Sequence, residues 1–334
     1  MGKYFVFFRF KMILPILAVL MLAFSAAAGE ESAVPTILPP PETPVPARPH
    51  VTPEPGPDYP VIVDRTSDPY AWPGFRFRLD AKLLDIWFPN IMNADETILL
   101  YEGETWLIDC GDVKMGSRGA ELLKKLGVQQ IDRLFNTHPH HDHLNGLSVT
   151  HQAAPVKEIL FCFGPESTEH ITKAISYAES NGIRISEFRE GDTFSMGGGD
   201  VSLKCFVNTD PALDMNNQSA VMLLSVGERR MLFTADMEKP GQVSLLARVP
   251  AEEIRAEILK YPHHGKSALD GDFLEAVNPS LAVVTNLRVD WEGVRYLAGK
   301  QIPTLFTNQS GVYLHLQTDG EHWLAELVPA DQVQ

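Results

Sequence analysis

Positive charge is scarce in this chain. Its 334 residues include 28 lysines and arginines against 43 aspartates and glutamates, which gives a formal charge of −15. Proteins that bind nucleic acid through a broad basic surface need many lysine and arginine contacts to phosphate, so the composition excludes that class. A small metal-dependent site for phosphoesters stays open, because bound cations supply positive charge locally.

Cysteine is also scarce. The three residues of this type, Cys110, Cys162 and Cys205, lie far apart in the sequence and form no Cys-x-x-Cys motif. A single disulfide can form if the chain is exported, but the sequence does not choose the pair. Three buried, apolar thiols are the default expectation.

The N-terminal apolar run, residues 12–24, is short for a membrane span of about 20 residues. Three basic residues precede it, and the small residues Ser25 to Ala28 follow it. We predict a signal peptide over residues 1–28, cleaved after Ala28, with an uncleaved anchor extended by residues 4–8 as the alternative. Removing its three positive charges takes the formal charge to about −18. The protein is therefore expected to be exported, either secreted or anchored at the extracytoplasmic face.

Proline dominates the next segment, from Gly29 to about Pro60. Because proline has no amide hydrogen and fixes φ, such a tract favours an extended, solvated spacer. We predict a linker over residues 29–74 that tethers the following domain to a membrane or cell wall; a ligand for a proline-binding partner is the alternative. No stable protein partner is predicted.

Residues 75–334 are predicted to form one domain, because no repeat and no second linker interrupt them. Strand-like runs at 97–101 and 105–109 flank a hairpin turn, and a helix is expected from Ser117 to a stop at Gly127. Strands and helices then alternate, which predicts an α/β sandwich.

The densest polar stretch follows an apolar strand at 131–135 and reads Thr-His-Pro-His-His-Asp-His from Thr137 to His143. Imidazole and carboxylate groups are the usual ligands of zinc and related ions. A surface histidine tract is the alternative, but patterned spacing favours a metal site. Asp236 and the pair His263-His264 also follow predicted strands, where loops converge, and are expected to complete the site.

Together these residues resemble the metallo-β-lactamase superfamily. The superfamily's His-x-His-x-Asp-His signature is matched by His138, His140, Asp142 and His143. Its further site residues at the ends of strands are matched by Asp109, Asp236 and His264. Within the superfamily, the His-Pro-His-x-Asp-His form, the Asn-Asn-Gln-Ser before a hairpin and the Pro-His-His-Gly resemble the C-terminal hydrolase domain of the competence protein ComEC and its secreted relatives.

The resemblance implies an αββα sandwich with two divalent metals, zinc first and manganese as the alternative. His138 and His140 would hold one metal, and Asp142, His143 and His264 the second, with Asp236 bridging them. Asp109 would orient a histidine ligand. His263 would face the substrate and serve catalysis together with Asp142 and Asp236.

One position departs from the pattern. Many members carry a further histidine where this chain reads Phe206-Val207-Asn208. His151 and His170, the histidines in the interval, are interpreted as surface residues. Asn208 or a water molecule is expected to approach the first metal in place of that histidine, which would weaken this site and make manganese as credible there as zinc.

The chemistry implied is hydrolysis. A hydroxide shared by two divalent ions is a strong nucleophile near neutral pH. The leading hypothesis is an exported enzyme acting on small-molecule or nucleic-acid phosphodiesters. The alternatives are hydrolysis of a small ester, such as a phosphocholine ester or lactone, and a non-catalytic metal-binding module of the cell envelope.

Overall fold

The computed structural model describes residues 62–66 and 75–333. The predicted signal peptide, residues 1–28, and most of the predicted linker lie outside the described residues. Among the residues that are described, no helix is long and apolar enough to cross a membrane.

The described part of the chain forms two sheets. One has nine strands in the order β1-β16-β15-β2-β3-β4-β5-β6-β7. They are β1 (Ile62–Asp64), β2 (Leu84–Phe88), β3 (Thr97–Tyr101), β4 (Glu104–Ile108), β5 (Arg133–Asn136), β6 (Glu158–Phe161), β7 (Arg184–Glu187), β15 (Val312–Thr318) and β16 (Trp323–Pro329). The other has seven strands in the order β14-β13-β12-β11-β10-β9-β8. They are β8 (Thr193–Met196), β9 (Val201–Phe206), β10 (Val221–Val226), β11 (Arg229–Phe233), β12 (Ile258–Lys260), β13 (Leu281–Val284) and β14 (Thr304–Phe306).

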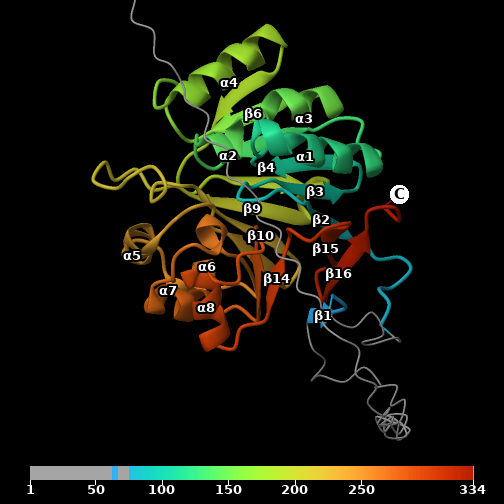
Figure 1. Ribbon diagram of the computed structural model, residues 1–334, viewed down its shortest axis with the longest axis vertical. Coiled ribbons are helices and arrows are strands. Elements are labelled where there is room, and N and C mark those ends of the chain that lie inside the picture. Colours follow the sequence, from blue (N-terminus) through green and yellow to red (C-terminus); the bar gives the residue numbers. More distant parts are fainter. Residues whose placement is uncertain (1–61, 67–74, 334) are drawn as a thin grey trace, which may run out of the picture. The chain divides into compact units, whose positions relative to one another are not determined.

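Helices cover the outer face of each sheet (Figure 1). Beside the nine-stranded sheet lie α1 (Val113–Lys125), α2 (His141–Leu144), α3 (Leu147–Ala153) and α4 (Glu169–Ser180). Beside the seven-stranded sheet lie α5 (Lys239–Leu246), α6 (Ala251–Ile254), α7 (Gly271–Val277) and α8 (Glu292–Gly299). The layers run helix, sheet, sheet, helix, which confirms the predicted αββα sandwich.

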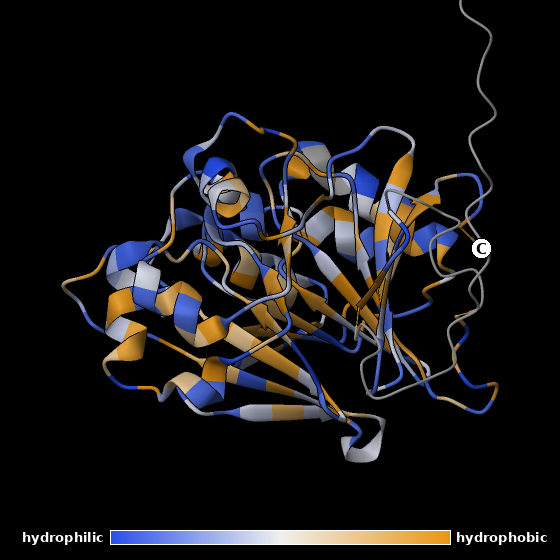
Figure 2. Cartoon of the chain, turned by 90° about the horizontal axis from the view of Figure 1, so that it is seen from below, coloured by the Kyte–Doolittle hydropathy of each residue, from blue (hydrophilic) through white to orange (hydrophobic). Residues whose placement is uncertain are grey.

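Three apolar clusters hold these layers together. Trp106, Phe135 and Phe233 belong to the cluster between the two sheets. A second cluster joins α1 and α4 to the nine-stranded sheet, and a third joins α5, α7 and α8 to the seven-stranded sheet. Hydrophobic residues accordingly line the strands in the interior of the molecule (Figure 2). Because both faces of each central strand are buried, the strands read as continuous apolar runs in the sequence.

The linker prediction needs correction at residues 62–66. Val63 is fully buried, and β1 pairs in parallel with β16, so these residues belong to the folded domain. A strand of three residues beside a proline-rich segment carries too short a pattern to be recognised, because its partner lies some 260 residues further along the chain.

Local signals explain both a confirmed turn and a misplaced helix start. The predicted hairpin between β3 and β4 turns at Glu102 and Gly103, which both have positive φ, as the tight hairpin turn requires. Helix α1 begins at Val113 rather than near Ser117, because the carboxylate of Asp112 accepts a hydrogen bond from the Lys114 backbone N–H at 2.7 Å and caps the helix.

The predicted buried thiols are found at Cys110 and Cys205, while Cys162 is half-buried; all three are free.

Candidate metal centre

The polar stretches predicted from the sequence meet at one end of the two sheets. Strand β5 pairs in parallel with β4 and β6, and residues 137–143 follow its carboxyl end. Strands β11 and β12 are also parallel, with Asp236 following the first and the 3₁₀ turn Pro262–Gly265 following the second. Both sheets therefore contribute residues to the same site, because carboxyl ends of parallel strands share an edge.

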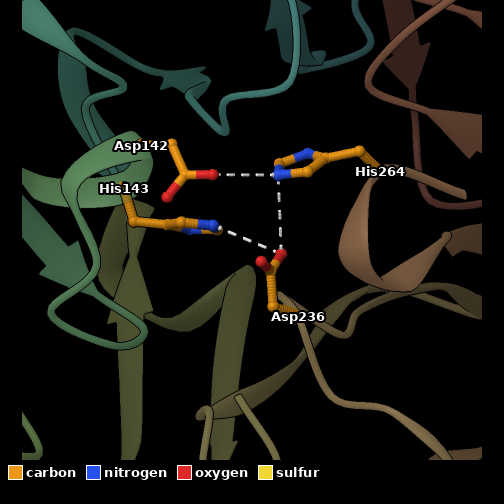
Figure 3. A group of neighbouring side chains, drawn as sticks. All are labelled: Asp142, His143, Asp236 and His264. Atoms are coloured by element: carbon orange, nitrogen blue, oxygen red, sulfur yellow. Dashed lines mark ion pairs between the residues drawn. The ribbon is translucent and has the colours of Figure 1, made fainter. Parts of the chain in front are cut away.

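Four of the predicted ligands converge on one point: Asp142, His143, Asp236 and His264 (Figure 3). One candidate ligand atom from each lies within 4.8 Å of the others. His143 Nε2 is 3.2 Å from Asp236 Oδ1, and His264 Nε2 is 3.4 Å from Asp142 Oδ2. Two imidazoles and two carboxylates at this spacing form a suitable donor set for a divalent ion.

Unpartnered atoms show that these residues fit a metal. The Nε2 atoms of His143 and His264 and Oδ1 of Asp236 are buried and have no hydrogen-bond partner of good geometry. Leaving such groups unsatisfied costs about 1–3 kcal/mol each, and a cation at their centre would accept all three lone pairs.

The opposite ring nitrogens are already occupied. His143 Nδ1 lies 2.7 Å from Asp109 Oδ2, and His264 Nδ1 lies 2.9 Å from Thr285 Oγ1. Because an acceptor holds the Nδ1 proton of each ring, a metal ion that displaces the other proton would find the Nε2 lone pair that a metal ligand needs. Asp109 thus stands where the sequence predicted it, orienting a histidine.

His138 and His140 form a second group of donors beside the first. His138 Nε2 lies 3.0 Å from His140 Nδ1 and 3.9 Å from Asp236 Oδ2. Oδ1 of Asp236 faces His143 while Oδ2 faces His138, so this one carboxylate lies between the two groups. A carboxylate at this position could contact an ion held by either group of donors.

Electrostatics differs between the two groups of histidines. Burial opposes charge on His143 and His264, but the Asp236 carboxylate outweighs it and raises the pKa of both, so a bound metal ion would displace a proton from each ring. Burial, with His143 close by, lowers the pKa of His138 well below its usual value, so this imidazole is neutral. Burial alone would raise the pKa of Asp236, but charge on His143 and His264 outweighs it and lowers that pKa well below its usual range. Asp236 is therefore a carboxylate anion between the two groups of donors.

Strained backbone is concentrated at this site. Of the eight described non-glycine residues with positive φ, four lie here: Asp109, Ala235, His263 and His264. Such conformations cost of order 1–3 kcal/mol each and persist only where surrounding contacts fix them. The fold therefore holds the two histidines of the Pro262–Gly265 turn in a conformation that local preference opposes.

His263 and Asn208 behave differently from each other. His263 Nε2 lies 3.6 Å from Asp236 Oδ2 and 2.8 Å from Lys266 Nζ, while its Nδ1 lies 2.8 Å from Glu238 Oε1. His263 thus lies at the site beside Asp236, where the sequence predicts that it faces the substrate. The Asn208 amide instead donates to Ser244 Oγ at 2.8 Å, and its Oδ1 accepts from the Asp210 backbone N–H at 3.1 Å, so both polar atoms predicted to approach the first metal are bonded elsewhere.

Sequence reasoning missed a buried polar group behind the site. Asp95 Oδ1 accepts a hydrogen bond from Thr285 Oγ1 at 2.7 Å and lies 3.2 Å from His264 Nδ1. The Lys260 ammonium contacts the other oxygen of Asp95 and donates to the Ala235 carbonyl at 3.3 Å. Lys260 and Asp95 are only 3% and 5% exposed. One signal was available, because a lysine inside the apolar run of β12 requires a buried partner.

Comparison with known proteins agrees with this geometry. A family model described as the metallo-beta-lactamase superfamily matches residues 97–284. The chain belongs to this superfamily, and its described residues include a candidate metal-binding site. ComE operon protein 3 of Bacillus subtilis (strain 168) is 26% identical over 189 residues, which cover 56% of this chain and 24% of that protein. The chain thus spans about a quarter of that relative's length, and the predicted resemblance is confirmed.

Solved structures with a similar fold include YhfI from Bacillus subtilis, with 12% identity and a TM-score of 0.47, covering 70% of this chain and 99% of that one. The short form of human tRNase Z has 16% identity and a TM-score of 0.40, covering 62% of this chain and 95% of that one.

Proposed function

We propose that this protein is an exported phosphodiesterase that uses two divalent metal ions, with zinc as the first choice and manganese as the alternative. One observation carries the proposal: Asp236 presents one oxygen to His143 and the other to His138, beside buried imidazole nitrogens that lack partners. In this proposal His138, His140 and Asp236 hold one ion, and Asp142, His143, His264 and Asp236 the other.

Two bound ions would lower the pKa of water and neutralise negative charge on a phosphodiester. The local charge then differs from that of the whole acidic chain. Four carboxylates surround the site, Asp95, Asp109, Asp142 and Asp236, and two divalent ions would balance them. The buried charge of Lys260 then leaves a net positive site for an anionic substrate.

The side chains of this chain supply orientation and proton handling. The Asp142 side chain is 15% exposed, whereas those of His143 and His264 are fully buried, so Asp142 borders the solvent side and can accept a hydrogen bond from the attacking water. His263 directs its Nδ1 proton at Glu238 and accepts a hydrogen bond from the Lys266 ammonium at Nε2. The Lys266 ammonium would donate a proton to the leaving oxygen as its bond to phosphorus breaks, and His263 would position that ammonium.

Export and tethering are part of the same proposal. They rest on the basic, apolar and small-residue order of residues 1–28 and on the proline tract that follows. In this proposal the hydrolase acts without a stable protein partner, held near a membrane or cell wall by its N-terminal segment.

The test combines metal content with turnover in the full chain. We expect elemental analysis to find about two divalent ions per chain, and bis-p-nitrophenyl phosphate to be hydrolysed with added zinc or manganese. Asp142→Asn should lower kcat at least 100-fold, because it removes a charged ligand and acceptor. His151→Gln is the matched control, since His151 lies in α3 and bonds the Val156 backbone N–H instead.

Two results would contradict the proposal. A chain that binds no metal, or one that turns over carboxylic esters and lactones but no phosphodiester, is not this enzyme. Equal activity of Asp142→Asn and wild type would show that Asp142 has no role in catalysis.

A further inference from the structure

A second feature lies beside the metal centre and has no part in holding metal. Lys266 Nζ lies 5.9 Å from the ring centroid of Trp291, and Arg288 Cζ lies 5.6 Å from the same centroid. Leu287 and Val289, on either side of Arg288 in the sequence, are 51% and 64% exposed. These five residues, Lys266, Leu287, Arg288, Val289 and Trp291, are called the Trp291 lip below.

Short contacts connect this lip to the site. The Lys266 ammonium lies 2.8 Å from His263 Nε2, and the same nitrogen lies 3.6 Å from Asp236 Oδ2. Lys266 therefore lies between the Trp291 ring and His263, which in turn contacts Asp236.

The lip is also fixed in place relative to the metal ligands. The side-chain amide of Asn286 contacts the His264 carbonyl, at the start of the lip loop. At the other end, a Cβ on Gly293 would lie 2.6 Å from the Gly265 carbonyl oxygen, so α8 packs closely on the ligand turn. Tyr261 Oη also donates to the Ser267 carbonyl at 2.9 Å. Contacts at both ends thus join the lip to the His264 turn.

The chemistry of the lip selects a class of ligand. Apolar and aromatic side chains at alternate positions, 287, 289 and 291, are interleaved with Arg288, whose guanidinium is oriented by a pair of 3.0 Å contacts to Asp290. An aromatic ring flanked by cations suits a flat base joined to phosphate. Two cations at the ring oppose a quaternary ammonium, which the phosphocholine alternative would place there.

We infer that the Trp291 lip binds single-stranded nucleic acid, stacking one base on Trp291 while Lys266 and Arg288 contact the adjoining phosphates. This rests on the proposed phosphodiesterase function and names its substrate class. Duplex ends would have to unpair before a base reached the ring, so single strands bind better. The small size of the lip fits a strongly acidic chain, because binding needs positive charge only at a few phosphates.

The experiment measures binding apart from turnover. Fluorescence anisotropy with labelled phosphorothioate 12-mers, which resist hydrolysis, compares a strand that carries bases with an abasic strand of the same charge. We expect Trp291→Ala to weaken binding of the strand with bases roughly 10-fold, and binding of the abasic strand less than 2-fold. Trp291→Phe, which keeps an aromatic face, should stay within about 3-fold of wild type on both strands.

Equal weakening of both strands, or unchanged binding of the strand with bases, would overturn the inference. So would competition by millimolar phosphocholine that disappears in Trp291→Ala, since that would identify an ammonium site. Hydrolysis of bis-p-nitrophenyl phosphate, measured in parallel, reports on the proposed function alone. If the wild-type protein binds the strand with bases through Trp291 but hydrolyses no phosphodiester, the inference about the lip stands and the proposed phosphodiesterase function is wrong.

Discussion

At the scale of single residues, Asp95 and Lys260 are the least expected part of the centre. Burying a lone carboxylate or ammonium is expensive, and the two charges compensate each other at the cost of removing both from water. Asp95 also lies 3.2 Å from His264 Nδ1 and 4.0 Å from His143 Nδ1. The charge of Lys260, with those of His264 and His143, outweighs the burial that opposes ionisation and holds the pKa of Asp95 far below its usual range. Lys260 therefore keeps Asp95 ionised beside both His264 and His143.

We predict that Asp95→Asn lowers affinity for one of the two metals by about 10- to 100-fold, because the charge that orients the histidines is lost. The single variant should also be destabilised by about 3–5 kcal/mol, since Lys260 is left buried and unpaired. Metal titration with a competing chelator, and thermal unfolding of the metal-free protein, measure the two effects separately.

The double variant Asp95→Asn/Lys260→Met is the control. It removes both buried charges, so its stability should recover while its metal affinity stays low. Recovery of metal affinity along with stability would show that the pair is only structural.

At the scale of elements, the site depends on how closely α2 approaches the end of β4. Backbone hydrogen bonds join Cys110 N–H to the His143 carbonyl at 2.9 Å and Gly146 N–H to the Gly111 carbonyl at 3.0 Å. A Cβ on Gly146 would lie 1.8 Å from the Cys110 carbonyl oxygen, although its φ of −69° suits any residue. Gly146 is therefore required by proximity and not by backbone conformation.

We predict that Gly146→Ala moves α2 away from β4, with a loss of about 1–3 kcal/mol in stability from overpacking. Because α2 carries Asp142 and His143, binding of the second metal should weaken at least 10-fold. Gly164→Ala is the matched control, since a Cβ there meets no atom within 4 Å. Equal metal affinity in the two alanine variants would show that α2 tolerates the shift.

At the scale of the whole molecule, the proposed ions would connect the two halves of the sandwich. His138, His140, Asp142 and His143 follow strand β5 of the nine-stranded sheet, whereas Asp236 and His264 follow β11 and β12 of the seven-stranded sheet. A group that binds only the folded state stabilises it by an amount set by its affinity, about 4 kcal/mol at a concentration 1,000 times its Kd.

We therefore expect removal of metal by a chelator to lower the Tm of the domain by about 10 °C in a single transition, since the ligands come from both sheets. Calorimetry of protein with and without metal measures this. In Asp236→Asn the same chelator should change Tm by less than about 3 °C. An unchanged Tm in wild type would mean that the bound ions do not bridge the sheets.

Much of this architecture could be predicted from the sequence, because its signals are local. Continuous apolar runs indicated the central strands, and the positive-φ turn at Glu102 and Gly103 followed from its residue types. The histidine and aspartate cluster is contiguous, so its spacing alone indicated a metal. Strand β1 was missed because three residues carry almost no pattern, and the start of α1 because Asp112 competed with Ser117 as a cap.

The sequence by itself determined which residues carry metal chemistry, since imidazole and carboxylate donors must be present in the chain whatever its shape. Only the tertiary structure decided which atoms face one another. It placed Asp95 beside His264 across 169 positions of sequence, turned Asn208 towards Ser244, and put Trp291 over Lys266. The physical reason is that these contacts depend on how two sheets pack and where their strands end, which long-range burial decides and local pattern does not record.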